Sequence, residues 1–121
     1  MYEVSAKVDF SAAHHLLEYE GGKCEQQHGH NWTVEVTVKG ELLDKSNILV
    51  DFKALKKDLR EILSELDHKD MNEIKSFEGE SPSSEFLANY IYYKMKEKYV
   101  ELYKVSIWET NESCAVYYEA E

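Results

Sequence analysis

The sequence predicts an α+β domain in which a four-stranded antiparallel sheet is covered on one face by two helices. Residues 2–14 and 30–39 alternate apolar and polar side chains, as half-buried strands do. Further strands are expected near 102–110 and 113–120, joined by the turn-like Asn111-Glu112. Two segments of helical spacing lie between these pairs, so the element order is ββααββ.

The first helix is expected to start after Asp51, whose side chain is a suitable N-cap. Its apolar stripe has helical spacing and consists of Phe52, Leu55, Leu59, Ile62, Leu63 and Leu66. For the second helix, Ser81-Pro82 predicts a start with proline at the first helical position. The buried side of that helix is predicted to contain Phe86, Leu87, Tyr90, Ile91 and Met95.

The length and net charge of the chain disfavour some classes of function. The 121 residues fit a single domain, 1–121, with one core. A formal net charge of −10 repels phosphate backbones, which disfavours nucleic-acid binding. No apolar run approaches the length of a membrane span, and the first residues lack the pattern of a secretory signal. We therefore expect a cytoplasmic protein with no membrane partner.

The segment Cys24-Glu25-Gln26-Gln27-His28-Gly29-His30 carries the strongest chemical signal. His28 and His30 are two residues apart, so in a strand both side chains leave the same face. On the first strand His14 shares the register of the apolar residues, whereas His15 falls on the opposite face. Adjacent pairing of the two strands would bring His14, His28 and His30 together. Three neutral imidazoles with an open fourth position are a usual catalytic zinc site.

Three other positions have both a chemical and an ordinary interpretation. Cys24 near a metal would have a depressed pKa and act as a base, or it is a small buried side chain. Asp67-His68 suits proton transfer, or His68 caps the first helix. Glu109 continues the apolar register of its strand, which suits a bidentate grip on an N–H/NH2 edge of a heterocycle, or the strand emerges into water there.

Taken together, these segments resemble the 6-pyruvoyl-tetrahydropterin synthase family, and most closely its queuosine-pathway branch, the 6-carboxy-5,6,7,8-tetrahydropterin synthases. The resemblance runs nearly end to end. It rests on Phe10-Ser11-Ala12-Ala13-His14, Cys24-x-x-x-His28-Gly29-His30, Val50-Asp51-Phe52, Leu66-Asp67-His68 with Asn72, Pro82-Ser83-Ser84-Glu85 and Trp108-Glu109-Thr110.

The resemblance implies a role for each of these positions. His14, His28 and His30 would bind Zn²⁺, Cys24 would be the catalytic base, and Asp67 with His68 would be a second acid/base group. Glu109 would bind the pterin ring. The implied fold is the tunnelling fold, in which subunits join their sheets into a barrel. Such assemblies are commonly homohexamers, dimers of trimers, with active sites at subunit interfaces.

The three-residue gap between Cys24 and His28 resembles the carboxy-forming branch. That branch converts 7,8-dihydroneopterin triphosphate to 6-carboxy-5,6,7,8-tetrahydropterin, acetaldehyde and triphosphate. Pyruvoyl synthesis on the same substrate is an alternative. Because Glu25 directly follows Cys24, cleavage of the side chain to 6-hydroxymethyl-7,8-dihydropterin is another. A pterin- or metal-binding module without turnover is the alternative outside the enzymes.

Overall fold

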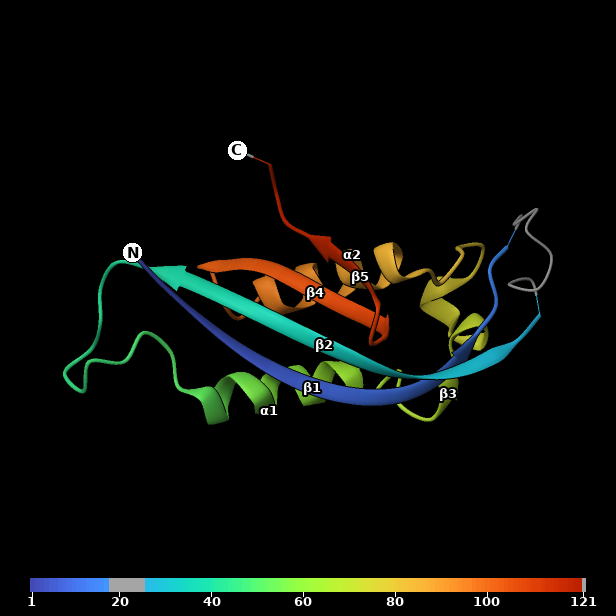
Figure 1. Ribbon diagram of the computed structural model, residues 1–121, viewed down its shortest axis with the longest axis horizontal. Helices are drawn as coiled ribbons and strands as arrows, with labels where there is room; N and C mark the ends of the chain where they lie inside the picture. The colour runs from blue at the N-terminus through green and yellow to red at the C-terminus, as the bar shows by residue number, and fades with distance from the viewer. Residues whose placement is uncertain (18–25, 121) are drawn as a thin grey trace.

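The computed structural model describes residues 1–17 and 26–120, which form one mixed sheet with two helices packed against it (Figure 1). The sheet has the strand order β3-β1-β2-β4-β5. In chain order the elements are β1 (Tyr2–His14), β2 (His28–Gly40), α1 (Phe52–Leu63), β3 (Lys69–Asp70), the 3-10 turns η2 (Met71–Glu73) and η3 (Lys75–Phe77), α2 (Ser84–Lys96), β4 (Leu102–Thr110) and β5 (Ser113–Tyr117).

The two longest strands, β1 and β2, are the centre of the sheet. They pair antiparallel without a register shift, from Tyr2↔Gly40 to His14↔His28. Alternation places one set of side chains under the helices, because a strand has a period of two residues. The predicted first strand is confirmed, and the second begins two residues earlier than predicted. The buried side chains of the pair are Ala6, Val8, Phe10, Ala12, Trp32, Val34, Val36 and Val38.

The sheet has a fifth strand that the sequence pattern did not predict. β3 contains only two residues and pairs in parallel with the end of β1, at Ala12↔Lys69 and Ala13↔Asp70. A segment of two residues has no periodicity to detect, so the predicted four-stranded, wholly antiparallel sheet was incomplete. The strand order leaves β3 and β5 at the edges, and the sheet does not close on itself within one chain.

Both helices lie on the same face of the sheet, as predicted. Asp51 caps α1 by accepting a hydrogen bond from the backbone N–H of Lys53 at 3.1 Å. Leu55, Leu59 and Leu63 of α1 are buried, and so is Leu66 beyond the helix end. Phe52, which the predicted apolar stripe included, is the first residue of the helix and is 57% exposed, so it does not join these core residues.

The start of α2 also differs from the prediction. Ser83 is the N-cap, with its hydroxyl oxygen accepting from the N–H of Phe86 at 3.1 Å, and the helix begins at Ser84. Pro82 therefore precedes the cap and is not the first helical residue. Its carbonyl group is directed towards β1, where it meets a histidine ring. In the part of the chain that the structure describes, no helix is long and apolar enough to span a membrane.

Candidate functional site

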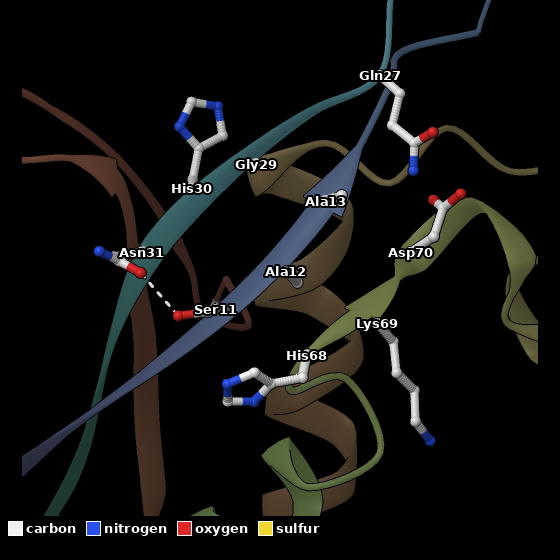
Figure 2. A pocket seen from close by; sticks show the side chains of 10 residues that line it. All are labelled: Ser11, Ala12, Ala13, Gln27, Gly29, His30, Asn31, His68, Lys69 and Asp70. Atoms are coloured by element: carbon white, nitrogen blue, oxygen red, sulfur yellow. Dashed lines mark hydrogen bonds between the residues drawn. The ribbon is translucent and has the colours of Figure 1, made fainter.

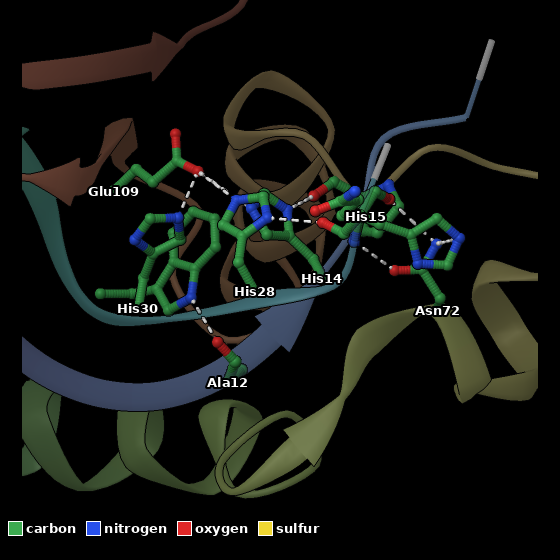
Figure 3. A network of polar contacts seen from close by, with 10 residues as sticks. Ala12, His14, His15, His28, His30, Asn72 and Glu109 are labelled. Atoms are coloured by element: carbon green, nitrogen blue, oxygen red, sulfur yellow. Dashed lines mark hydrogen bonds and ion pairs between the residues drawn. The ribbon is translucent and has the colours of Figure 1, made fainter. Parts of the chain in front are cut away.

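The histidines of β1 and β2 gather at the end of the paired strands. His14 lies directly opposite His28, and Ala12 lies opposite His30, so the three rings share one face. Their ring centroids are 4.6 Å apart for His14–His28, 4.7 Å for His28–His30 and 5.5 Å for His14–His30. Figure 3 shows the three rings beside one another, with Glu109 above them. The structure thus places His14, and not His15, beside His28 and His30, as strand parity predicted.

Backbone carbonyl groups orient two of these rings. Nδ1 of His14 is 2.8 Å from the carbonyl oxygen of Pro82, and Nδ1 of His28 is 2.8 Å from that of Gln26. A carbonyl oxygen only accepts, so each Nδ1 must carry the proton. In the neutral form of each ring, Nε2 then holds a lone pair directed into the cluster. This is the arrangement by which a second partner fixes the tautomer of a metal-binding histidine.

His30 is held by packing. Its ring contacts that of Trp32, with 5.5 Å between the centroids, and the Trp32 indole N–H donates to the carbonyl oxygen of Ala12 at 3.2 Å. Burial lowers the pKa of His30, against the opposing effect of the Glu109 charge. Its Nε2 is buried without a well-aligned hydrogen bond to any described residue. A neutral imidazole with such an orphaned nitrogen is the form that binds a metal.

Glu109 brings a carboxylate to the same point. Its Oε1 is 2.9 Å from Nε2 of His14, 2.9 Å from Nε2 of His30 and 3.8 Å from Nε2 of His28. The four ligand atoms all lie within 4.8 Å of one another. Neutral imidazole lone pairs and a carboxylate oxygen repel one another at such distances unless a proton or a metal cation lies between them.

The donor set fits a divalent transition metal. Imidazole nitrogens and a carboxylate oxygen are ordinary zinc ligands, and tetrahedral ligand atoms at zinc distances of 2.0–2.1 Å are about 3.3 Å apart. The observed 2.9 and 3.8 Å separations lie on either side of that value. His14 is 2% exposed, while the other three side chains are 21–31% exposed, which leaves one open side. The residues present therefore fit a zinc-type metal centre.

Asp67 and His68 form a second polar group in the turn after α1. Nδ1 of His68 is 3.0 Å from Oδ1 of Asp67, and the same oxygen accepts from the backbone N–H of Ser11 at 2.9 Å. The hydrogen bond from Ser11 is the main reason that the pKa of Asp67 is lowered. His68 does not cap α1, because the helix ends at Leu63 and Ser64 is its C-cap. The alternative interpretation of His68 as a helix cap is therefore wrong.

His68 adopts an unusual backbone conformation. Its φ of 61° lies in the left-handed region, which residues other than glycine rarely adopt. The side chain is 80% exposed, and it lines an open pocket of about 520 Å³ together with Ser11, His30 and Asn31. Figure 2 shows β1 passing between the rings of His30 and His68. The cluster of His14, His28, His30 and Glu109 within one chain does not include Asp67 or His68.

Sequence reasoning missed the groups that orient the site. The carbonyl oxygens of Pro82 and Gln26 are backbone atoms, which a search for ligating side chains does not detect. The placement of Glu109 against the histidines was also missed, although its apolar register was the available signal. Cys24, the predicted base, lies outside the described residues, as does Glu25.

Comparisons with known proteins agree over nearly the whole chain. A family model described as 6-pyruvoyl tetrahydropterin synthase matches residues 3–120. The chain is 34% identical over 109 residues to the dihydroneopterin monophosphate aldolase of Pyrococcus furiosus, covering 88% of each chain. It is 35% identical over 124 residues to the 6-carboxy-5,6,7,8-tetrahydropterin synthase of Synechocystis sp., covering 98% of this chain and 94% of that relative.

A solved structure is similar as well. The 6-pyruvoyl tetrahydropterin synthase of Caenorhabditis elegans superposes with a TM-score of 0.88 at 29% sequence identity. The match covers 98% of this chain and 96% of the nematode chain. The sheet, the two helices and their order are therefore those of an enzyme of this kind.

Proposed function

Because the chain belongs to the 6-pyruvoyl tetrahydropterin synthase family, we propose that it is a zinc-dependent lyase acting on a pterin triphosphate. The reaction proposed is conversion of 7,8-dihydroneopterin triphosphate and one water molecule to 6-carboxy-5,6,7,8-tetrahydropterin, acetaldehyde and triphosphate. The convergence of three imidazole Nε2 atoms and a carboxylate on one point carries this proposal. The name of the Synechocystis relative supports the carboxylated product, which would serve queuosine biosynthesis.

His14, His28 and His30 are the proposed zinc ligands. When bound, the zinc ion would act as a Lewis acid on the oxygens of the substrate side chain and acidify the neighbouring C–H bonds. The protein supplies the orientation. The carbonyl groups of Pro82 and Gln26 orient the rings of His14 and His28 through Nδ1, and Trp32 packs against the third ring.

The remaining steps need a base, an acid and a pterin anchor. Cys24 is proposed to remove a proton from the side chain of the substrate, and His68, paired with Asp67, to move a proton on the other side. Glu109 is proposed to accept hydrogen bonds from the N–H and amino groups of the pterin ring. Its Oε1 is directed at the histidines, so the ring would be held close to the metal ligands.

The active site is proposed to be shared between subunits. His68 is highly exposed and separated by β1 from the cluster of its own chain, so a second copy would bring its Asp67-His68 pair to that cluster. Both edges of the sheet are available for joining copies into a barrel. A homohexamer formed from two trimers, acting in the cytoplasm, is the assembly proposed.

Side-chain cleavage is the second candidate function. The Pyrococcus relative is named an aldolase for dihydroneopterin monophosphate, and Glu25 beside Cys24 offers a carboxylate for such a reaction. The product would be 6-hydroxymethyl-7,8-dihydropterin. Pyruvoyl synthesis is the third candidate, supported by the Caenorhabditis elegans structure. A pterin- or metal-binding module without catalysis is the candidate outside the enzymes.

One experiment separates these candidates. Purified, zinc-loaded protein is incubated with 7,8-dihydroneopterin triphosphate, and with the monophosphate in parallel, and the products are identified by mass spectrometry. The proposal predicts 6-carboxy-5,6,7,8-tetrahydropterin from the triphosphate. Formation of the hydroxymethyl- or pyruvoyl-pterin instead would select the corresponding alternative. Binding without any product would leave only the binding module.

A further inference from the structure

The side chain of Asn72 is bonded to the backbone of β1 immediately after the metal-ligand position His14. Its Oδ1 accepts from the N–H of His15 at 2.8 Å, and its Nδ2 donates to the carbonyl oxygen of His15 at 3.0 Å. A weaker contact joins Nδ2 to Nε2 of the His15 ring at 3.4 Å. Figure 3 shows the Asn72 amide facing His15, beside the histidine cluster.

This amide continues the pairing between β1 and β3 past the end of β3. The last paired residues are Ala13 and Asp70, after which the chain turns into η2 and its backbone leaves β1. Asp70 accepts from the N–H of Asn72 at 3.0 Å and so fixes where the Asn72 side chain starts. A carboxamide has the same donor and acceptor as a peptide group, so it can pair with a strand as a backbone would.

His14 is consequently fixed on both sides along β1. Ala13 before it is paired with β3, and His15 after it is held by Asn72. The His14 ring is then oriented by the Pro82 carbonyl group at Nδ1, and its Nε2 is directed into the cluster. Without Asn72, the backbone of His15 would lose both of these hydrogen bonds, so the end of β1 beyond Ala13 would be less firmly held.

We propose that Asn72 is a positioning residue of the metal centre, which sets the metal affinity by fixing the backbone at His14. This inference rests on the proposed metal centre. Partners that orient metal ligands typically contribute 10- to 100-fold to metal affinity, roughly the range expected for Asn72.

The test is Co²⁺ and Zn²⁺ binding by three full-length variants. Asn72→Leu keeps the shape and loses both hydrogen bonds, and Asn72→Asp keeps only the acceptor for the His15 N–H. Ser81→Ala is the matched control, because the Ser81 hydroxyl also accepts from an extension of β1, the N–H of Leu17 at 2.9 Å. Affinities are measured by competition with a chelating dye, and ligand geometry by the visible absorption of bound Co²⁺.

We expect Asn72→Leu to lower the affinity for both Co²⁺ and Zn²⁺ about 10- to 100-fold and to alter the absorption spectrum of bound Co²⁺. Asn72→Asp should lower both affinities as well, even though its added negative charge favours cation binding. This variant provides the test if Asn72→Leu does not fold. Ser81→Ala should match the wild type. Wild-type affinity and spectrum in the folded Asn72 variants would overturn the inference alone, since the metal centre would stand. A wild-type protein that binds neither metal would overturn the metal centre and the inference together.

Discussion

Each imidazole of the cluster is oriented by a different group, so substitutions at single positions should affect the cluster differently. His14 and His28 are held through Nδ1 by the carbonyl groups of Pro82 and Gln26, whereas His30 is held by its packing on Trp32. His15, the neighbour of His14, interacts with Asn72 on the other side of the strand. At the scale of single residues, the three clustered histidines are therefore distinguished from His15, which lies outside the cluster.

Substitution of His28 by alanine should remove the metal. Only two of the three proposed ligands would remain, one fewer than the three protein ligands of a catalytic zinc site. Elemental analysis of the purified variant should find well under one zinc per chain. His15→Ala is the control and should retain full zinc content. Stoichiometric zinc in His28→Ala would contradict the ligand assignment.

Glu109→Gln separates two roles of one carboxylate. If Glu109 binds the pterin ring, loss of its charge removes charge-assisted hydrogen bonds of about 1.5–3 kcal/mol, which is roughly 10- to 100-fold in affinity. Titration with 7,8-dihydroneopterin should show this loss while zinc content stays at the wild-type level. Glu112→Gln, in the turn that follows, should change neither. Loss of zinc with unchanged pterin affinity would make Glu109 a metal ligand instead.

At the scale of elements, the site depends on strand parity. His28 and His30 share a face only because exactly one residue separates them, and the paired end of β1 brings His14 to that face. The helices serve indirectly, since the segment before α2 supplies the Pro82 carbonyl group. Shifting the start of β2 by one residue should therefore disrupt the proposed metal centre, while the hydrophobic core stays in place.

An alanine inserted after Gly29 tests this dependence. It moves His28 to the opposite face while Trp32 and the following residues keep their register with β1. Metal affinity should fall to the level of His28→Ala, with the helical circular dichroism spectrum retained. Gly29→Ala is the control, because its added Cβ would meet only the Ala12 carbonyl oxygen at 4.0 Å. Wild-type affinity in the insertion variant would refute the parity argument.

The same scale shows how far the sequence could predict the structure. Alternation over 13 residues specified β1 to the residue, and parity alone selected His14 over His15. Patterns of side chains could not reveal β3, because two residues show no period and their pairing uses backbone groups. For the same reason the role of Pro82 was missed: its carbonyl group acts in the site, while its ring suggested a helix start.

At the scale of the whole molecule, the tunnelling fold that the sequence motifs implied is confirmed by the match to the nematode enzyme. Within one chain the sheet is open, and β1 separates the exposed His68 from the histidine cluster. Under the proposed mechanism, a single copy holds the metal ligands of one site and the Asp67-His68 pair of another. This arrangement predicts that activity can be recovered by mixing two inactive variants.

Co-expression of Cys24→Ala and His68→Ala provides that test. Each variant alone should be inactive, since each lacks one proposed proton-transfer group. In randomly mixed assemblies, about a quarter of shared sites would have both groups intact, because each group comes from a different copy. Recovery of activity towards that fraction supports shared sites. No recovery in assemblies shown by mass spectrometry to be mixed would place both groups in the same chain.

The most direct test of the metal centre is anomalous X-ray scattering from crystals of the zinc-loaded protein, recorded on both sides of the zinc absorption edge. The account predicts one strong zinc peak per chain, within bonding distance of Nε2 of His14, His28 and His30. A peak bound elsewhere, or none at this cluster in protein that binds zinc stoichiometrically, would contradict it.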